Sequence, residues 1–93
     1  MIEQKFKEEI EKLGSRFREL REAINLIQLD LEVRCGISRT DISKIENGHT
    51  NIEFLTLVKI AESLKVELSV FFKSEKEWKK YIKMVKKENE LKK

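Results

Sequence analysis

The sequence has no proline, a single cysteine and only three glycines among its 93 residues. One cysteine excludes an internal disulfide and any metal site built from several thiolates. We expect Cys35 to be a small buried side chain rather than a reactive thiol, because no partner that would activate it is evident in the sequence. Charged and aliphatic residues are abundant while proline and glycine are scarce, and this predicts a chain that is mostly helix.

Long apolar runs are also missing. No segment approaches the roughly 18 apolar residues of a transmembrane helix. The first seven residues, from Met1 to Lys7, contain no apolar block like that of a secretory signal. Apolar and charged residues each make up 40% of the chain, which is enough apolar surface for one helical core. We therefore expect a small cytoplasmic protein.

The residues that carry most enzyme chemistry are equally scarce. The chain has one histidine and one cysteine. It has no glycine-rich loop to cradle a phosphate and no cluster of residues spaced to hold a metal ion. His49 stands alone in a polar loop, as an ordinary loop residue does. We therefore expect no catalysis, no cofactor and no metal site.

Positive charge is unevenly distributed along the chain. The net charge is +3, but residues 73–93 hold nine lysines against four glutamates, a net +5. Residues 1–72 hold eleven basic and thirteen acidic residues, a net −2. A nucleic-acid-binding protein is expected to carry a basic face. The totals alone do not indicate one, so a role in nucleic-acid binding depends on where individual charges are placed.

Apolar residues follow a helical period in the first quarter of the chain. A glycine inside a helix costs about 1 kcal/mol, so Gly14 either divides this segment into two helices or lies within one. The stripe recurs at steps of three and four and comprises Ile2, Phe6, Ile10, Leu13, Phe17, Leu20 and Ile24.

Two short helices joined by a glycine follow. A helical segment over 28–34 ends before Gly36, because glycine readily takes the left-handed conformation that closes a helix. Ser38 is the predicted N-cap of a second short helix over 39–46, which Gly48 terminates.

Three further helices are predicted downstream. The first spans 52–64, with Asn51 as its cap, and a short helix over 66–72 follows with a cap near Ser69. The last spans 74–91. The predicted fold class is therefore all-α.

The two short helices, embedded among longer ones, are typical of a helix-turn-helix. In that motif the first helix braces the second, which lays exposed side chains into a DNA major groove about 12 Å wide. The second helix therefore needs a buried side and a polar side. Ile42 and Ile45 supply the buried side, and the polar side consists of Arg39, Thr40, Ser43 and Lys44.

At these residues the sequence resembles the phage repressor and Cro superfamily of helix-turn-helix regulators, the xenobiotic-response-element (XRE) family. The resemblance covers roughly residues 13–72 and rests on three segments: Leu13-Gly14-Ser15-Arg16-Phe17-Arg18-Glu19-Leu20-Arg21, then Gln28 with Leu31, then Gly36-Ile37-Ser38-Arg39-Thr40-Asp41-Ile42-Ser43-Lys44-Ile45-Glu46-Asn47-Gly48.

The resemblance implies a five-helix, repressor-like DNA-binding domain over 1–72, followed here by an additional lysine-rich amphipathic helix over 73–93. It implies a sequence-specific transcriptional regulator, a repressor or an autoregulatory controller, that binds a palindromic operator in double-stranded DNA as a dimer. Small restriction-modification controller proteins belong to the same group.

Individual roles follow from the resemblance by position. The second short helix would read bases with Arg39, Thr40, Ser43 and Lys44, and phosphates would be bound by Gln28, Ser38 and Asn47. Arg21 and Glu46 would form a structural pair. Both lie at inward-facing places in the pattern, where a charge is tolerated only if it is paired.

Three positions depart from the family pattern. Ile27 stands where a Ser, Thr or Asn usually caps the first short helix, so that side-chain cap is lost. Glu32 replaces the usual alanine at the crossing of the two short helices, so its carboxylate must swing outward or find a basic partner. Ile52 replaces a common proline, which leaves the start of the fourth helix less fixed.

The end of the chain carries many large apolar groups for so small a protein. We expect them to form a two-fold interface between copies, centred on Phe71, Phe72, Trp78 and Ile82. The alternative is that the helix over 74–91 folds back onto its own domain, which would bury Trp78 without a partner.

A second function class fits the acidic balance of residues 1–72. An antitoxin or adaptor would have another protein, such as a toxin, as its main partner. The intact pattern of Ser38, Arg39, Thr40, Lys44 and Asn47 favours DNA binding over that alternative.

Overall fold

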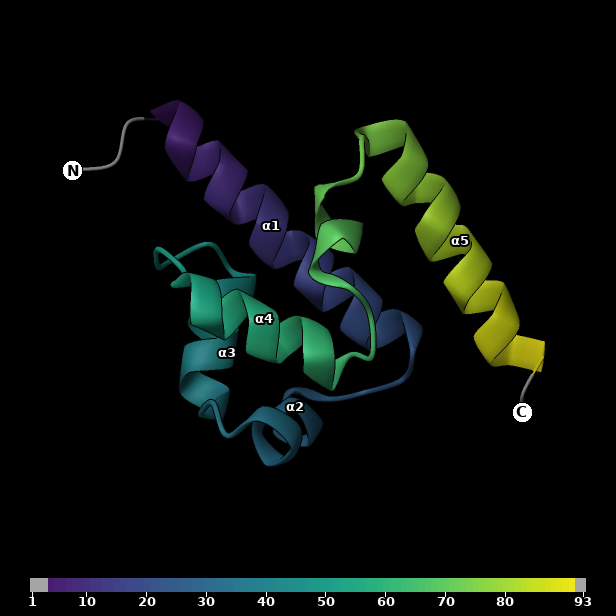
Figure 1. The fold of residues 1–93 in the computed structure, drawn as a ribbon, viewed down its shortest axis with the longest axis horizontal. Coiled ribbons are helices and arrows are strands. Elements are labelled where there is room, and N and C mark those ends of the chain that lie inside the picture. Colours follow the sequence, from purple (N-terminus) through teal and green to yellow (C-terminus); the bar gives the residue numbers. More distant parts are fainter. Residues whose placement is uncertain (1–3, 92–93) are drawn as a thin grey trace.

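The computed structural model describes residues 4–91, and within them it contains helices and no strands (Figure 1). The all-α prediction is confirmed. Ile2, Lys92 and Lys93, which the predicted elements include, lie outside the described residues. The elements in chain order are α1 (Gln4–Ala23), α2 (Gln28–Cys35), α3 (Arg39–Glu46), α4 (Phe54–Ser63), the 3-10 helix η1 (Leu68–Phe72) and α5 (Glu75–Leu91).

Helix α1 runs without a break through Gly14, so the first of the two alternatives for this glycine is wrong. Gly14 is buried where the end of α3 crosses α1. A Cβ atom at this position would overlap the backbone carbonyl oxygen of Ile45 and would lie 3.1 Å from its carbonyl carbon. The glycine is therefore needed for the close approach of two backbones, which outweighs its low helix propensity.

The helix-turn-helix forms as the sequence indicates. Gly36 closes α2 in the left-handed conformation, with φ at 76°. The Oγ of Ser38 accepts a hydrogen bond of 3.2 Å from the backbone N–H of Asp41, which confirms the predicted cap of α3. Ile27 provides no side-chain cap for α2, but the Asp30 carboxylate accepts the Ile27 backbone N–H at 2.8 Å and fixes that end from the other side.

Two predicted caps are wrong. Helix α4 begins at Phe54 after Glu53, not after Asn51, and η1 follows Glu67, not Ser69. Ile52, in the place of the common proline, is partly buried against the core. We attribute the late start of α4 to this packing, because the anchored chain stays extended through Glu53, where ψ is 147°.

One hydrophobic core joins all the elements. Phe17 and Leu20 of α1 lie at 1% exposure, and residues from every other helix pack around them. Cys35 packs against the edge of this core but is only partly buried, whereas a buried side chain was expected. The buried cluster comprises Phe17, Leu20, Leu31, Ile42, Ile45, Leu57, Ile60, Ala61, Leu64, Phe71, Trp78 and Ile82.

The C-terminal helix folds back onto its own domain. Phe71 and Trp78 are each 2% exposed and Ile82 is 5% exposed, all within a single copy of the chain. Their side chains therefore present no surface to a second copy, which corrects the interface expected for these three residues. Only Phe72 of the four expected residues is exposed, at 61%.

Opposite sides of α1 contact α3 and α5. Gly14 and Arg21 meet α3, whereas Arg16 and Glu19 meet η1 and α5. At 100° per residue these two pairs project on opposite faces of the helix. Figure 1 shows the same arrangement, with α5 on one side of α1 and the group of α2, α3 and α4 on the other. The helix-turn-helix and the C-terminal helix are thus separated by α1.

Arg16 fastens the C-terminal part of the chain to α1. Its side chain is 4% exposed, and Nη1 donates to the carbonyl oxygens of Phe71 at 3.0 Å and Lys73 at 2.6 Å. The guanidinium also lies over the Trp78 ring, 4.9 Å from its centroid. At the edge of the same ring, Trp78 Nε1 donates to Glu19 Oε1 at 3.2 Å. These contacts fix which face of α5 is turned inward.

No helix among residues 4–91 combines the length and apolar character needed to cross a membrane.

Candidate nucleic-acid interface

Helix α3 has one side in the core and the other in solvent. Ile42 and Ile45 are 1% and 4% exposed. Arg39, Thr40 and Lys44 are exposed, and Ser43 is partly buried. The structure therefore brings the four expected base-reading residues together on one short helix, with long cationic side chains at both ends of the row. This is the arrangement that insertion into a major groove requires.

The C-terminal end of α3 is held by a buried ion pair. Arg21 Nε donates to Glu46 Oε2 at 2.8 Å, and Arg21 Nη2 donates to Glu46 Oε1 at 3.0 Å. The two side chains are 9% and 2% exposed. Arg21 makes one more hydrogen bond, from Nη1 to the carbonyl oxygen of Leu26 at 2.8 Å. The pair expected from the sequence thus connects α1, the loop before α2 and the end of α3.

The contacts of this pair favour the charged form of Arg21. The hydrogen bonds to Glu46 raise the pKa of Arg21 above its ordinary value, and they outweigh burial, which acts in the opposite direction. A bidentate arginine–carboxylate contact also fixes orientation, because both partners are planar. The end of α3 is therefore held in angle as well as in position.

Gln28, the first residue of α2, belongs to the same cluster. Its Nε2 donates to Glu46 Oε1 at 3.0 Å, and its side chain is partly buried. The amide nitrogen carries two hydrogens, so one remains for a phosphate oxygen. Asn47 follows Glu46, and its Nδ2 donates to the backbone oxygen of Ser43 at 2.8 Å. Gln28 and Asn47 thus both lie where the start of α2 meets the end of α3, whereas Ser38 lies at the other end of α3.

The N-terminal end of α3 is held by a residue that departs from the family pattern. Glu32 is partly buried, and its Oε1 accepts a hydrogen bond of 2.6 Å from the backbone N–H of Arg39. The carboxylate therefore pairs with an unsatisfied helix N–H rather than with a basic side chain. The expected basic partner is therefore not the one found, because the helix terminus itself is the partner.

The charge around α3 is not strongly basic. Residues 28–47 contain three basic residues, Arg34, Arg39 and Lys44, against four acidic ones, Asp30, Glu32, Asp41 and Glu46, a net −1. The negative charge of Glu46 is offset by the positive charge of Arg21 in their ion pair. Arg34 is directed away from α3, because its Nη1 donates to the carbonyl oxygen of Ser63 at 3.0 Å. Arg39 and Lys44 are therefore the two cations that α3 offers to DNA.

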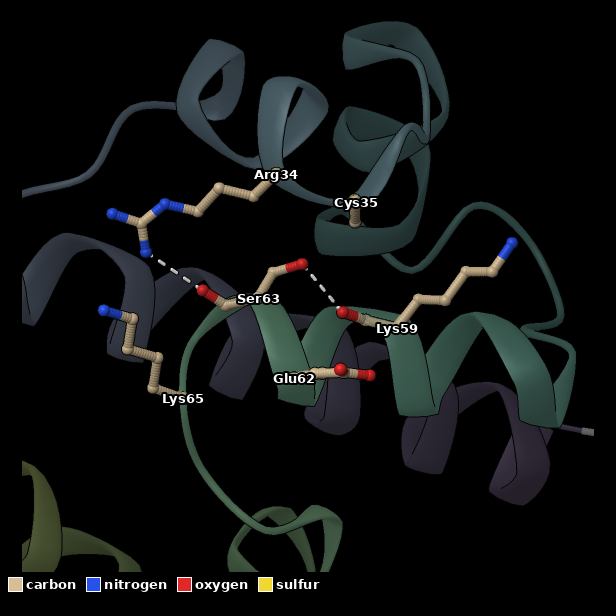
Figure 2. Close-up of a pocket in the computed structure, with 6 residues that line it drawn as sticks. All are labelled: Arg34, Cys35, Lys59, Glu62, Ser63 and Lys65. Carbon is tan, nitrogen blue, oxygen red and sulfur yellow. Dashed lines mark hydrogen bonds between the residues drawn. The ribbon is translucent and has the colours of Figure 1, made fainter.

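The open groove that contains Arg34 lies between the ends of α2 and α4 and has a volume of about 540 Å³ (Figure 2). Arg34 covers the last turn of α4, and Ser63 Oγ donates to the Lys59 carbonyl oxygen at 2.8 Å. Basic residues are favourable at a helix C-terminus, where carbonyl oxygens lack partners. Closure of the end of α4 accounts for the contacts observed here. The groove is lined by Arg34, Cys35, Lys59, Glu62, Ser63 and Lys65.

Sequence reasoning missed the contacts of two residues, Arg16, which holds the C-terminal part of the chain, and Glu32, which holds the start of α3. Arg16 stands four and seven residues before Leu20 and Ala23, so its place on an inward face could have been noticed. Its partners are backbone carbonyls 55 and 57 residues away, which no local pattern indicates. Glu32 was noticed as a departure, but its bond to the start of α3 depends on the turn between the helices.

Comparisons with known proteins point to one family. A family model described as helix-turn-helix matches residues 17–71. The chain is 37% identical over 54 residues to an uncharacterized HTH-type transcriptional regulator, y4dJ, of Sinorhizobium fredii, and the match covers 58% of this chain and 70% of that protein. The solved structure of the restriction-modification controller protein C.AhdI from Aeromonas hydrophila matches with 32% identity and a TM-score of 0.68. That match covers 70% of this chain and 98% of the controller.

These findings agree with the resemblance read from the sequence. The five-helix, repressor-like arrangement is confirmed by the similarity to the controller structure. The family consists of DNA-binding transcriptional regulators rather than enzymes. The family model does not cover α5, nor the part of α1 before Phe17.

Proposed function

Because this chain belongs to the helix-turn-helix family of DNA-binding transcriptional regulators, we propose that it is a sequence-specific repressor or autoregulatory controller that binds a palindromic operator as a homodimer. The observation that carries this proposal is the set of polar side chains on the solvent side of α3, with Arg39 and Lys44 at its two ends. The buried ion pair of Arg21 and Glu46 holds this helix rigidly. Side chains that read nucleobases need such a rigid support, because small displacements break bidentate contacts.

The proposed roles divide into specifying and positioning contacts. Arg39, Thr40, Ser43 and Lys44 read base edges in the major groove, and arginine pairs with the O6 and N7 atoms of guanine. Gln28, Ser38 and Asn47 bind phosphates, which orient the protein without carrying sequence information. Phosphate contacts at both ends of α3 would fix its register in the groove.

Replacing Arg39 with alanine should relax specificity at one base pair of each half-site. A good bidentate contact contributes about 1–3 kcal/mol of discrimination against the wrong base, so preference for that base should fall by about 5- to 150-fold. Selection of binding sites from a random duplex pool by wild type and Arg39→Ala measures this directly. An unchanged base preference at every position would remove Arg39 from the reading set.

Gln28→Ala is the matched comparison for this experiment. It removes one phosphate donor, so affinity should fall for all sequences about equally while base preference stays as in the wild type. A change of base preference in this variant would show that Gln28 acts through the position of Glu46, to which it donates, rather than through phosphate.

The dimer is supported by apolar side chains that the fold leaves in solvent. A soluble monomer rarely keeps many large apolar groups in contiguous patches on its surface, and a two-fold interface would place two copies of α3 about 34 Å apart, one turn of DNA. Phe72 is the one expected interface residue that stays accessible. The other large apolar side chains that are at least half exposed are Phe6, Ile27, Val33, Phe54, Leu55, Met84 and Leu91.

Sedimentation at micromolar concentration should therefore give a dimer, and Phe72→Glu should shift it toward the monomer, because a charge would be buried without a partner. Val33→Glu is the control, since Val33 is more exposed than Phe72 but lies on α2. A wild-type monomer that binds single half-sites would contradict the dimer. A dimer that survives Phe72→Glu would place the interface elsewhere.

A further inference from the structure

The exposed side of α5 carries a straight row of lysines. From Lys76 to Lys87 the helix holds six lysines against one glutamate, a net +5, and all six lysines are exposed. Four of them, Lys76, Lys80, Lys83 and Lys87, are spaced at four, three and four residues, so they project within about 60° of one another along about 16 Å of helix. These four residues are called the lysine row below.

The lysine row points away from the core. Trp78 and Ile82, at 2% and 5% exposure, define the inward face of α5, and the row projects about 150° from them around the helix axis. The contacts of Trp78 to Arg16 and Glu19 hold that rotation in place. The row is therefore a fixed feature of the surface.

The row also lies on the far side of the molecule from α3. Helix α1 separates the two, with α3 against its Gly14 side and α5 against its Glu19 side (Figure 1). When α3 enters a major groove, the row faces away from that groove. It therefore does not assist the contact that α3 makes with the same segment of duplex.

We propose that the lysine row is a second, sequence-independent binding surface for duplex DNA, through which the protein joins its operator to another DNA segment. The inference rests on the proposed function, in which α3 holds the operator. Lysine is a flexible point charge that neutralises phosphates without reading bases. Duplex DNA presents about one negative charge per 1.7 Å of axis, so a row of about 16 Å finds a phosphate for each lysine.

The composition of the row favours a nucleic acid over an acidic protein. Protein interfaces are depleted in lysine at their centre and enriched in aromatic residues and arginine. The row has neither, because the aromatic residues of α5, Trp78 and Tyr81, lie on its inward side at buried and partly buried positions. Residues 28–47 carry a net −1, so the row is also the stronger attraction for a polyanion.

A two-duplex capture experiment tests the proposal with the full chain. An operator selected from a random pool is fixed to beads and saturated with protein, and a labelled duplex of unrelated sequence is then added at low salt. Wild-type protein should hold the second duplex. The variant K76Q/K80Q/K83Q/K87Q should remain on the operator and lose the second duplex, because α3 is untouched.

The control variant K5Q/K12Q/K59Q/K65Q removes the same charge from exposed lysines outside α5, and it should still capture the second duplex. The dependence of log K on log salt for the unrelated duplex should fall by about 3–4 in the row variant, at about 0.9 per phosphate contact.

If the control variant lost the second duplex to the same extent as the row variant, the proposal would be overturned. The total charge of the protein, and not the lysine row, would then explain the capture. No capture by wild-type protein would overturn it as well, and would leave an acidic protein surface as the partner class for the row. Failure of the proposed function would give a different result, because no operator would emerge from the selection. Binding of the unrelated duplex would still test the lysine row in that case.

Discussion

Replacing Glu46 with alanine should destabilise the protein by about 3–5 kcal/mol, the cost of removing one partner from a buried ion pair. The residue left behind is Arg21, whose side chain is 9% exposed and would keep its charge with only the Leu26 carbonyl as partner. Domains of this size have total stabilities of about 5–15 kcal/mol. The loss is therefore a large part of the whole.

Glu46 has this weight because three separate parts of the chain meet at its carboxylate. It accepts two hydrogen bonds from Arg21 of α1 and one from Gln28 of α2, while its own backbone ends α3. Without it, the start of α2 and the end of α3 lose their common anchor. We therefore expect operator affinity to fall together with stability.

Urea titration measures the change, and the melting temperature should fall by about 4–8 °C for each kcal/mol lost. Glu22→Ala is the matched control, because Glu22 pairs with Arg18 at 3.7 Å and both are more than half exposed. Such surface pairs contribute about 0–1 kcal/mol. If Glu46→Ala and Glu22→Ala have the same melting temperature, the ion pair of Arg21 and Glu46 does not hold α3.

The double replacement Arg21→Met with Glu46→Met separates charge from packing. Substituting a buried pair by apolar residues of similar volume is often neutral or stabilising. Stability should therefore recover in the double variant, while the angle of α3, no longer fixed by a planar contact, should be less well defined. Recovered stability with weakened operator binding would assign the pair a positioning role.

Local signals predicted α3 with its bounds as observed. Ser38 caps it and Gly48 follows it, and both act through the backbone of their immediate neighbours. The prediction of α4 missed its start because Asn51 is only a local signal, and the packing of Ile52 against distant residues overrode it. Local chemistry thus determined the bounds of α3 more fully than the start of α4.

The placement of α5 shows where sequence reasoning ended. The spacing of Trp78, Ile82 and Val85 predicts an apolar face, but it cannot tell whether that face meets the same chain or another copy. The deciding contacts are a buried arginine and a carboxylate on α1, Arg16 and Glu19, which lie about 60 residues earlier. The lysine row follows from that decision, because burying one face of α5 exposes the other.

Gly14→Ala should strongly destabilise the protein although it adds only one methyl group. The added Cβ would overlap the carbonyl oxygen of Ile45, a backbone atom that cannot rotate aside as a side chain can. Overpacking of a well-packed site costs about 1–3 kcal/mol and sometimes more. A contact against backbone belongs at or above the upper end, and this outweighs the roughly 1 kcal/mol that alanine gains over glycine within a helix.

The direction of the displacement links this cost to function. The carbonyl that must move belongs to the last turn of α3, one residue before Glu46. Pushing α1 and α3 apart there would also lengthen the contacts between Arg21 and Glu46, which are now 2.8 and 3.0 Å. Operator affinity in Gly14→Ala should therefore fall even at temperatures where the protein remains folded.

Ser15→Ala provides the control, because Ser15 is the exposed neighbour in the same helix and alanine there only improves helix propensity. Its stability should equal or slightly exceed that of the wild type, whereas Gly14→Ala should unfold at clearly lower urea concentration with an unchanged m value. A Gly14→Ala protein as stable as Ser15→Ala would mean that α1 and α3 can separate at this crossing without loss. The buried glycine would then not be what sets the distance between the recognition helix and its support.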